Sequence, residues 1–368
     1  MNNNKNKCTD SALKVNEGIP QPPSVNPNIL ARLKARKKKT LTVDDYVKGI
    51  LDGDRTTLSK AITMIESSLP KDHTMAQAII EKCLPYAGKS VRLGITGVPG
   101  VGKSTFIESM GNHLTGLGHK VAVLAIDPSS QRTKGSILGD KTRMETLCNN
   151  PDAFIRPSAS AGSLGGVARK TRESIVLCEA AGYDAILVET VGVGQSEIAV
   201  HSMVDFFLLL MLAGAGDELQ GIKRGIMEMA DALIVNKADG DNAHKAGLAK
   251  VQYQSALHLF PPLESKWTPK VDTCSAIKEE RIANVWNIVT DYVKLTKENR
   301  FFEKKRQEQA IQIMYESIDE SLKDNFYSDN KIEADLDKAK SEILNYKVSS
   351  YVAAQKLLDE YFAKKNEG

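Results

Sequence analysis

The segment Gly97–Thr105 limits the possible folds of this chain more than any other part of it. It reads Gly-Val-Pro-Gly-Val-Gly-Lys-Ser-Thr and fits the pattern G-x-x-x-x-G-K-[ST]. A short apolar strand is expected before it at 91–96, and a helical pattern follows it at 106–114. A chance glycine-rich turn would not need these flanking elements, so the segment predicts a phosphate loop between a strand and a helix.

The chemistry of such a loop explains its composition. Backbone N–H groups can turn inward at the glycines and surround phosphate oxygens, while the next helix presents the positive end of its dipole. We expect Lys103 to place its charge at the β- and γ-phosphates and Ser104 to place its hydroxyl on Mg²⁺. The other residues predicted to line the nucleotide are Gly97, Val98, Pro99, Gly100, Val101, Gly102 and Thr105.

Length and composition narrow the remaining possibilities. The chain has 368 residues, enough for one large α/β domain with helical additions or for two domains. A net charge of +3 and a strongest apolar run (206–213) too short to cross a bilayer argue against nucleic acid and membranes as partners. The five cysteines form no C-x-x-C pair, which favours free thiols in a reducing compartment. The N-terminus lacks the apolar core of a secretory signal, and we predict a cytoplasmic protein.

Composition divides the chain into four segments. Residues 1–39 are polar, contain several prolines and end in a basic run, which predicts a flexible arm that is solvated or contacts an acidic partner. Segment 40–88 has apolar residues at helical spacing and is expected to form an N-terminal helical layer. Segment 89–296 is the predicted nucleotide domain, and the Lys/Glu-rich segment 297–368 is a predicted C-terminal helical arm.

Within 89–296, apolar strands alternate with helical patterns. This alternation predicts an α/β fold with a mostly parallel central sheet that is covered on both faces. The expected strands are 91–96, 121–126, 153–155, 184–189, 206–213, 231–236 and 270–274. The expected helices are 104–116, 139–149, 167–181, 221–230, 242–259 and 279–296. Ligands of such sheets bind at the carboxyl ends of the strands, so polar residues there become candidates for the site.

The motif N-K-x-D at 236–239 directly follows one of these strands. Asp239 can accept hydrogen bonds from N1–H and the 2-amino group of guanine, whereas adenine offers no such pair, so the motif favours GTP over ATP. Lys237 can lay its alkyl stem over the base, and Asn236 can tie the motif to the phosphate loop. The remaining base contact suits two residues after the next strand, Ser275 and Ala276. Segment 277–281 departs from the usual pattern because it holds no glycine, which leaves the shape of that loop open.

A third motif joins a metal ligand to a switch. An apolar strand ends at Glu189, which can hold Mg²⁺ through its water shell, and Gly192 shortly after it can donate its N–H to a γ-phosphate. A surface glutamate after a core strand is the alternative. Asp127 ends another strand and is similarly placed for the metal, and Asp140 is a weaker third carboxylate. With the guanine motif, these residues predict a P-loop GTPase that uses Mg²⁺.

The residue that positions the attacking water is not evident from the pattern. The nearest glutamine after Gly192 is Gln195, and the sequence assigns no arginine to the charge of the transition state. We therefore expect slow intrinsic hydrolysis that a partner, or the closure of a loop, accelerates.

The C-terminal segment carries three apolar stripes on a charged background. Packing on the nucleotide domain and self-association both suit such helices, and we expect a homodimer contact. The stripes consist of Ile311, Met314, Ile318, Leu322 and Phe326; of Ile332, Leu336, Ala339 and Ile343; and of Tyr351, Ala354, Leu357, Leu358 and Tyr361.

With these motifs assembled, the chain resembles the MeaB/ArgK family of P-loop GTPases, which includes the human methylmalonic-aciduria type A protein. The resemblance runs from about Val43 to the C-terminus. It rests on eight strings in order: Ile50–Arg55, Gly94–Thr105, Ala125–Ser130, Gly135–Met144, Leu164–Ala168, Glu189–Glu197, Gly221–Glu228 and Asn236–Asp239.

The resemblance implies a homodimeric GTPase that acts on adenosylcobalamin-dependent acyl-CoA mutases, chiefly methylmalonyl-CoA mutase, gating cofactor delivery and protecting the mutase. It implies phosphate and metal roles for Lys103 and Ser104, and Mg²⁺ or switch positions for Asp127, Asp140 and Glu189. The loop 214–220 with Lys223 looks like an extra switch that reports the nucleotide state to the mutase. This loop is glycine-rich and charged, as a mobile element would be, although a plain connection is the alternative.

Two other classes of function are weighed against this one. A metal-delivery GTPase of the nickel-insertion kind should show a His-rich arm or paired Cys and His ligands, but the six histidines are scattered. A transport-associated kinase or ATPase, which an older label of the family suggests, conflicts with the guanine-selecting Asp239.

Overall fold

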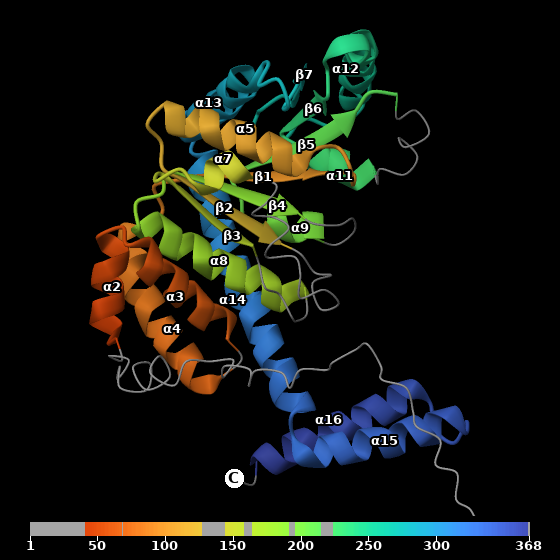
Figure 1. Ribbon diagram of the computed structural model, residues 1–368. Helices are drawn as coiled ribbons and strands as arrows, with labels where there is room; N and C mark the ends of the chain where they lie inside the picture. Colours follow the sequence, from red (N-terminus) through yellow and green to blue (C-terminus); the bar gives the residue numbers. More distant parts are fainter. Residues whose placement is uncertain are drawn as a thin grey trace, which may run out of the picture. The chain divides into compact units, whose positions relative to one another are not determined.

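Seven strands in the described part of the chain form one sheet, and every neighbouring pair is parallel. They are β1 (Val91–Gly97), β2 (Val121–Ile126), β3 (Ala153–Pro157), β4 (Ala185–Thr190), β5 (Phe206–Leu212), β6 (Ala232–Asn236) and β7 (Lys270–Thr273). Their order is β3-β2-β4-β1-β5-β6-β7, so the segment after β1 leaves the sheet near its centre (Figure 1). The α/β prediction is confirmed, and this sheet is parallel throughout rather than mostly so.

The computed structural model describes residues 41–67, 69–126, 144–157, 164–190, 196–214 and 224–366. Val43–Gly368 belong to one compact unit, and the other unit, Met1–Thr42, lies almost entirely outside the described residues. The predicted flexible arm at 1–39 is therefore not described, and the boundaries of the four predicted segments stay predictions.

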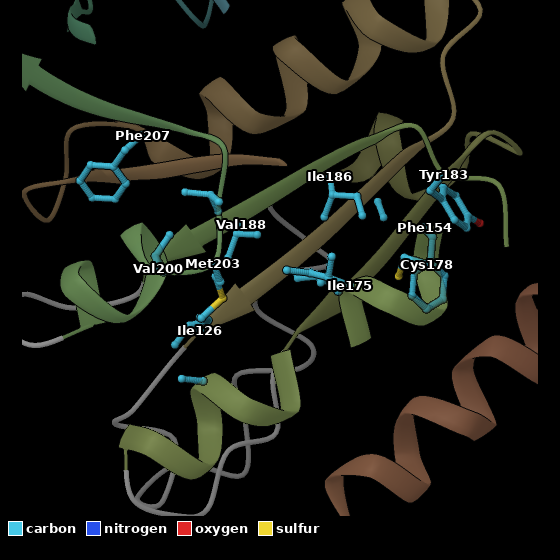
Figure 2. Close-up of a cluster of buried hydrophobic side chains, with 14 of the residues drawn as sticks. Ile126, Phe154, Ile175, Cys178, Tyr183, Ile186, Val188, Val200, Met203 and Phe207 are labelled. Atoms are coloured by element: carbon cyan, nitrogen blue, oxygen red, sulfur yellow. The ribbon is translucent and has the colours of Figure 1, made fainter. Parts of the chain in front are cut away.

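Both faces of the sheet are buried, because apolar side chains of the central strands β4 and β5 point to either side of it. Helices α5 (Lys103–Gly116), α7 (Glu145–Cys148) and α13 (Ile282–Glu298) cover one face. The other face lies under α8 (Leu164–Ala180), α9 (Ser196–His201), α11 (Arg224–Met229) and α12 (Ala243–Leu257). Figure 2 shows this second face, where Ile186 and Val188 of β4 lie near Ile175 of α8 and Val200 of α9.

An aspartate directly precedes several strands and fixes the register at their starting ends. Asp184 accepts a hydrogen bond from the Lys120 N–H at 2.9 Å, and Asp205 accepts one from the Arg92 N–H at 2.8 Å. Asp231 accepts one from the Phe207 N–H at 2.9 Å. Each carboxylate thus satisfies an N–H of the neighbouring strand that would otherwise lack a partner.

The sequence patterns missed α9 entirely. This helix lies on β1 at Gly94, where a Cβ atom would come within 2.8 Å of Val200 Cγ1. A glycine inside a strand often marks the close approach of another element, so Gly94 was the available signal.

Several predicted boundaries are wrong as well. The helix expected from 279 begins at Ile282, and the one expected from 167 begins at Leu164. Within the helix expected at 139–149, the described residues are helical only over Glu145–Cys148.

The N-terminal helices α2 (Val43–Leu51), α3 (Arg55–Glu66) and α4 (Pro70–Cys83) pack against one another and against α8. Asp54 separates the first two, because its side chain caps α3 by accepting from the N–H groups of Thr56 and Thr57. The Gln77 amide of α4 donates to Glu173 of α8 at 2.9 Å. The predicted N-terminal helical layer is therefore present.

The C-terminal region consists of α14 (Phe301–Tyr327), α15 (Asn330–Leu344) and α16 (Ser350–Asn366). The first turns of α14 are bonded to the segment just before β5. Arg306 donates to both carboxylate oxygens of Asp205 at 2.7 Å, and Gln309 donates to the Val204 carbonyl at 3.0 Å. Across the described residues, the structure has no helix with the length and apolarity required for a membrane span.

Candidate nucleotide-binding site

The phosphate loop lies between the end of β1 and the start of α5, as predicted. Gly97, Gly100 and Gly102 have φ angles of 150°, 80° and 93°, which other residues rarely adopt. At Gly97 a Cβ atom would also lie 2.5 Å from the Leu210 carbonyl oxygen of β5. Val98 and Pro99 lie in the loop itself, Val101 is buried beneath it, and Thr105 is exposed in the first turn of α5. The glycines of the motif therefore serve both the backbone shape and the close packing on β5.

Lys103 bends back over this loop. Its Nζ donates to the Gly97 carbonyl at 2.8 Å. Burial lowers the pKa of its ammonium, and the carboxylates of Glu189 and Glu197 oppose part of that shift. The amine thus lies at the phosphate loop, and the two carboxylates favour its charged form.

Glu189 lies one residue before the end of β4, directly beside Ile95 of β1 and Ala125 of β2. Its side chain is buried, and its Oε1 accepts from the Ser104 hydroxyl at 3.3 Å. A hydroxyl and a carboxylate oxygen at this distance are the donor types that Mg²⁺ prefers. Two of the four predicted metal ligands are thus brought together, while Asp127 and Asp140 lie outside the described residues.

The N-K-x-D motif directly follows β6 and is bonded to the phosphate loop. The buried Asn236 amide donates to the Val101 carbonyl at 2.9 Å, and its oxygen accepts from the Ala276 N–H at 3.1 Å. Lys237, whose φ is 57°, donates from Nζ to the Gly100 carbonyl at 2.8 Å. The tie that the sequence predicted for Asn236 is present, and Lys237 adds a second one.

Asp239 and the segment after β7 lie side by side. The Ser275 hydroxyl donates to Asp239 Oδ1 at 2.8 Å. Ala276 is held from below by Ser109 of α5, whose hydroxyl donates to the Ala276 carbonyl at 2.6 Å. The structure therefore gathers the predicted base residues at one point, next to the phosphate loop.

The loop without glycine has a defined shape. Ser275 and Glu280 exchange both of their backbone hydrogen bonds, at 3.1 and 3.0 Å, and close a short hairpin. Glu279 and Arg281 take the left-handed conformation, with φ of 56° and 63°, at positions where glycine would be unstrained.

Three predicted site residues are not described by the structure, and two buried residues of the site were not predicted. Gly192, Gln195 and Lys223, to which catalytic or switch roles were assigned, lie outside the described residues. Sequence reasoning missed Ser109 and Glu197, both buried. Glu197 lies within one of the strings quoted above but received no role, and Ser109 sits in an ordinary helical pattern that gives no signal.

A parallel sheet with this strand order, a phosphate loop after its central strand and a guanine-type N-K-x-D motif after β6 define a P-loop GTPase. The comparisons with known proteins agree. The family model described as "Methylmalonyl Co-A mutase-associated GTPase MeaB" matches residues 58–331.

Named relatives extend the match. "GTPase ArgK" of Escherichia coli is 44% identical over 287 residues, 78% of this chain and 87% of that protein. "Methylmalonic aciduria type A homolog, mitochondrial" of Mus musculus is 42% identical over 334 residues, covering 88% of this chain and 80% of that protein. A solved structure described as "LAO/AO transport system kinase" superposes with a TM-score of 0.70 at 34% identity, covering 87% of this chain and 97% of that one. The chain belongs to the MeaB family and is a GTPase.

Proposed function

We propose that this GTPase is a nucleotide-gated chaperone of an adenosylcobalamin-dependent acyl-CoA mutase, with methylmalonyl-CoA mutase as the partner. In this role it gates delivery of the cofactor and protects the mutase. The observation that carries the proposal is the match over 58–331 to a family of GTPases associated with methylmalonyl-CoA mutase. The guanine and phosphate residues that meet at one edge of the sheet support it, because they provide the site at which a nucleotide would set the state of the protein.

Within this proposal, Lys103 neutralises the β- and γ-phosphates and Asp239 selects guanine. The Ser104 hydroxyl and Glu189 Oε1 lie 3.3 Å apart, and these two residues would hold Mg²⁺ together with Asp127 and Asp140. A bound Mg²⁺ would neutralise phosphate charge during hydrolysis. Ser275 and Ala276 contact the base, and the loop 214–220 with Lys223 reports the nucleotide state to the mutase.

The proposal includes slow intrinsic hydrolysis. Gly192 would sense the γ-phosphate, Gln195 is the nearest glutamine for the attacking water, and no arginine is assigned to the transition state. Single-turnover measurements on the isolated protein, with and without the mutase, test this part. A rate for the protein alone that equals the rate with the mutase would contradict it.

The proposal includes a homodimer formed through the C-terminal helices. Four apolar residues on one stripe of α14, Ile311, Met314, Ile318 and Leu322, are 46–55% exposed. A stripe of this spacing on a long helix suits a helix–helix contact with a second copy. Sedimentation velocity of the wild type and of a Met314→Glu, Ile318→Glu variant tests it, because only the wild type should sediment as a dimer.

The main experiment exploits the base contact. Immobilised wild type should capture purified methylmalonyl-CoA mutase to different extents with GDP and with a non-hydrolysable GTP analogue. In Asp239→Asn the side-chain amide can donate to the C2 carbonyl of xanthine, so the response should move from guanine to xanthine nucleotides. If both proteins capture the same amount of mutase with GDP and with the GTP analogue, nucleotide gating is contradicted. If Asp239→Asn still prefers guanine nucleotides, the assignment of Asp239 to the base is contradicted.

A further inference from the structure

The loop 274–281 carries the predicted base contact, and its two halves are held differently. Cys274 and Ala276 in the first half are buried, and Ala276 is bonded to Asn236 and Ser109. Residues 277–281 are exposed, and Ile277 is 76% accessible, so burial of apolar side chains does not fix this second half of the loop. Its two left-handed residues, Glu279 and Arg281, are strained there because neither is glycine. Something other than backbone preference must therefore stabilise this shape.

Besides the backbone bonds between Ser275 and Glu280, the side chain of Arg281 stabilises this shape. Its Nη2 donates to both carboxylate oxygens of Asp272, at 2.6 and 2.7 Å. Asp272 belongs to β7, directly before the loop, and is buried, so the pair joins the end of the loop to the rigid strand at its beginning. Charge-assisted contacts of this kind are stronger than neutral ones.

Two further features show that Asp272 is a firm anchor. Lys250 of α12 also donates to it, at 2.9 Å, and holds the carboxylate from outside the loop. Burial by itself would raise the pKa of Asp272, but the bonds from Arg281 and Lys250 outweigh it and leave the pKa below its ordinary value. The carboxylate is therefore ionised at neutral pH and available to the guanidinium.

We propose that Arg281 is a positioning residue for recognition of guanine O6. It acts through its ion pair with Asp272, which holds Ser275–Lys278 against Asp239. In guanine, O6 is adjacent to N1, so the segment that touches the N1-reading Asp239 is the one whose backbone can reach O6. The N–H groups of Ser275, Ala276 and Lys278 donate to Glu280, Asn236 and the Ser275 hydroxyl, so within this segment the N–H of Ile277 is the one to contact O6. This inference rests on the proposed guanine site and adds the residue that gives one of its contacts its geometry.

The test uses the full chain and three diphosphates. GDP carries all the guanine contacts, inosine diphosphate lacks the 2-amino group that Asp239 reads, and 6-thioguanosine diphosphate replaces only O6 by a larger, weaker acceptor. For Arg281→Ala we expect GDP affinity to fall about tenfold, the value of one well-made hydrogen bond. The affinity for 6-thioguanosine diphosphate divided by that for GDP should move towards one, because the contact to O6 is weakened. The affinity for inosine diphosphate divided by that for GDP should keep its wild-type value, because the contact to the 2-amino group is unchanged.

Two further variants separate the ion pair from its surroundings. Lys250→Ala removes the other cation on the same carboxylate but leaves the loop tied, so both ratios should remain as in the wild type. Arg281→Gly relieves the left-handed strain and removes the guanidinium, so it should behave as Arg281→Ala. Thermal unfolding of each variant measures any general damage.

Each alternative outcome overturns the proposal. If Arg281→Gly binds as the wild type does, backbone shape and not the ion pair positions the loop. If both ratios shift together in Arg281→Ala, or neither does, Arg281 has no specific role at O6. A wild type that prefers ADP to GDP would instead contradict the guanine site itself, so failure of the two ideas can be told apart.

Discussion

The two halves of the candidate site are built in different ways. The base half, residues 236–239 with 272–281, is joined by bonds between its own parts: Asn236 to Ala276, Ser275 to Asp239 and Arg281 to Asp272. The phosphate half, comprising the phosphate loop, the end of β4 and helix α9, instead gathers buried charges. Lys103 lies near the carboxylates of Glu189 and Glu197.

This difference indicates what each half needs from a ligand. The bonds of the base half satisfy its polar groups within the protein, so its shape is largely set before a base arrives. In the phosphate half the charges would be balanced further by phosphate and a cation. Specificity would then depend on preorganisation in one half, and hydrolysis on electrostatics in the other.

The largest effect is expected when the phosphate half loses its cation. Lys103→Ala should lower GTP hydrolysis by on the order of 100-fold, the usual cost of removing a group that stabilises transition-state charge. Lys237→Ala is the matched control, because each lysine donates to a carbonyl of the phosphate loop at 2.8 Å but Lys237 belongs to the base half. It should weaken nucleotide binding and leave the rate of the bound complex nearly unchanged. Equal losses of that rate in both variants would remove the distinction between the halves.

A smaller effect is expected at the residue that joins the halves. Asn236→Ala should lower the free energy of unfolding by about 2–4 kcal/mol, because it leaves a buried carbonyl at Val101 and a buried N–H at Ala276 without partners. Asn236→Asp keeps the acceptor for Ala276 but replaces the donor to Val101 by a carboxylate oxygen, which adds a buried charge, so its loss should be at least as large. Urea unfolding measures both, and a loss below about 1 kcal/mol in the alanine variant would show that water replaces these bonds.

The same contrast explains how far the sequence predicts this molecule. Strands, the phosphate loop and the N-K-x-D motif are local patterns, and the seven strands and the tie of Asn236 to the phosphate loop were predicted correctly. Helix α9 was not, because it depends on the approach of Val200 to Gly94, which is far away in the sequence. Ser109 gave no signal for a similar reason, since its partner Ala276 is far away in the sequence. The hairpin at 275–280 was not predicted either, because it contains two left-handed residues that are not glycine, and its ion pair between Arg281 and Asp272 follows no turn pattern.

The smallest effect concerns acid, which should loosen the phosphate half before the base half. Burial, aided by the charge of Lys305, lowers the pKa of His201 at the end of α9 from 6.5 to about 4. The folded state therefore favours neutral His201. Its contribution to the free energy of unfolding is complete above pH 6.5 and is lost as the pH falls towards about 4, because protonation then favours the unfolded state. The pKa of Asp272 in the base half is held below 3.8, so its contribution persists until the pH falls lower still.

Another group titrates in the same pH range. Burial raises the pKa of Asp231 to about 6, so its protonation stabilises the folded state as the pH falls. A comparison of the wild type with a His201 variant is therefore needed to isolate the effect of His201. Urea unfolding of the wild type and of His201→Gln should be compared at several pH values between 4 and 7. The wild type should lose more stability than the variant as the pH falls, while Asp272→Asn should differ from the wild type equally across that range. If His201→Gln and the wild type lose stability in parallel, His201 is not the acid-sensitive group, and both halves of the site would respond to acid alike.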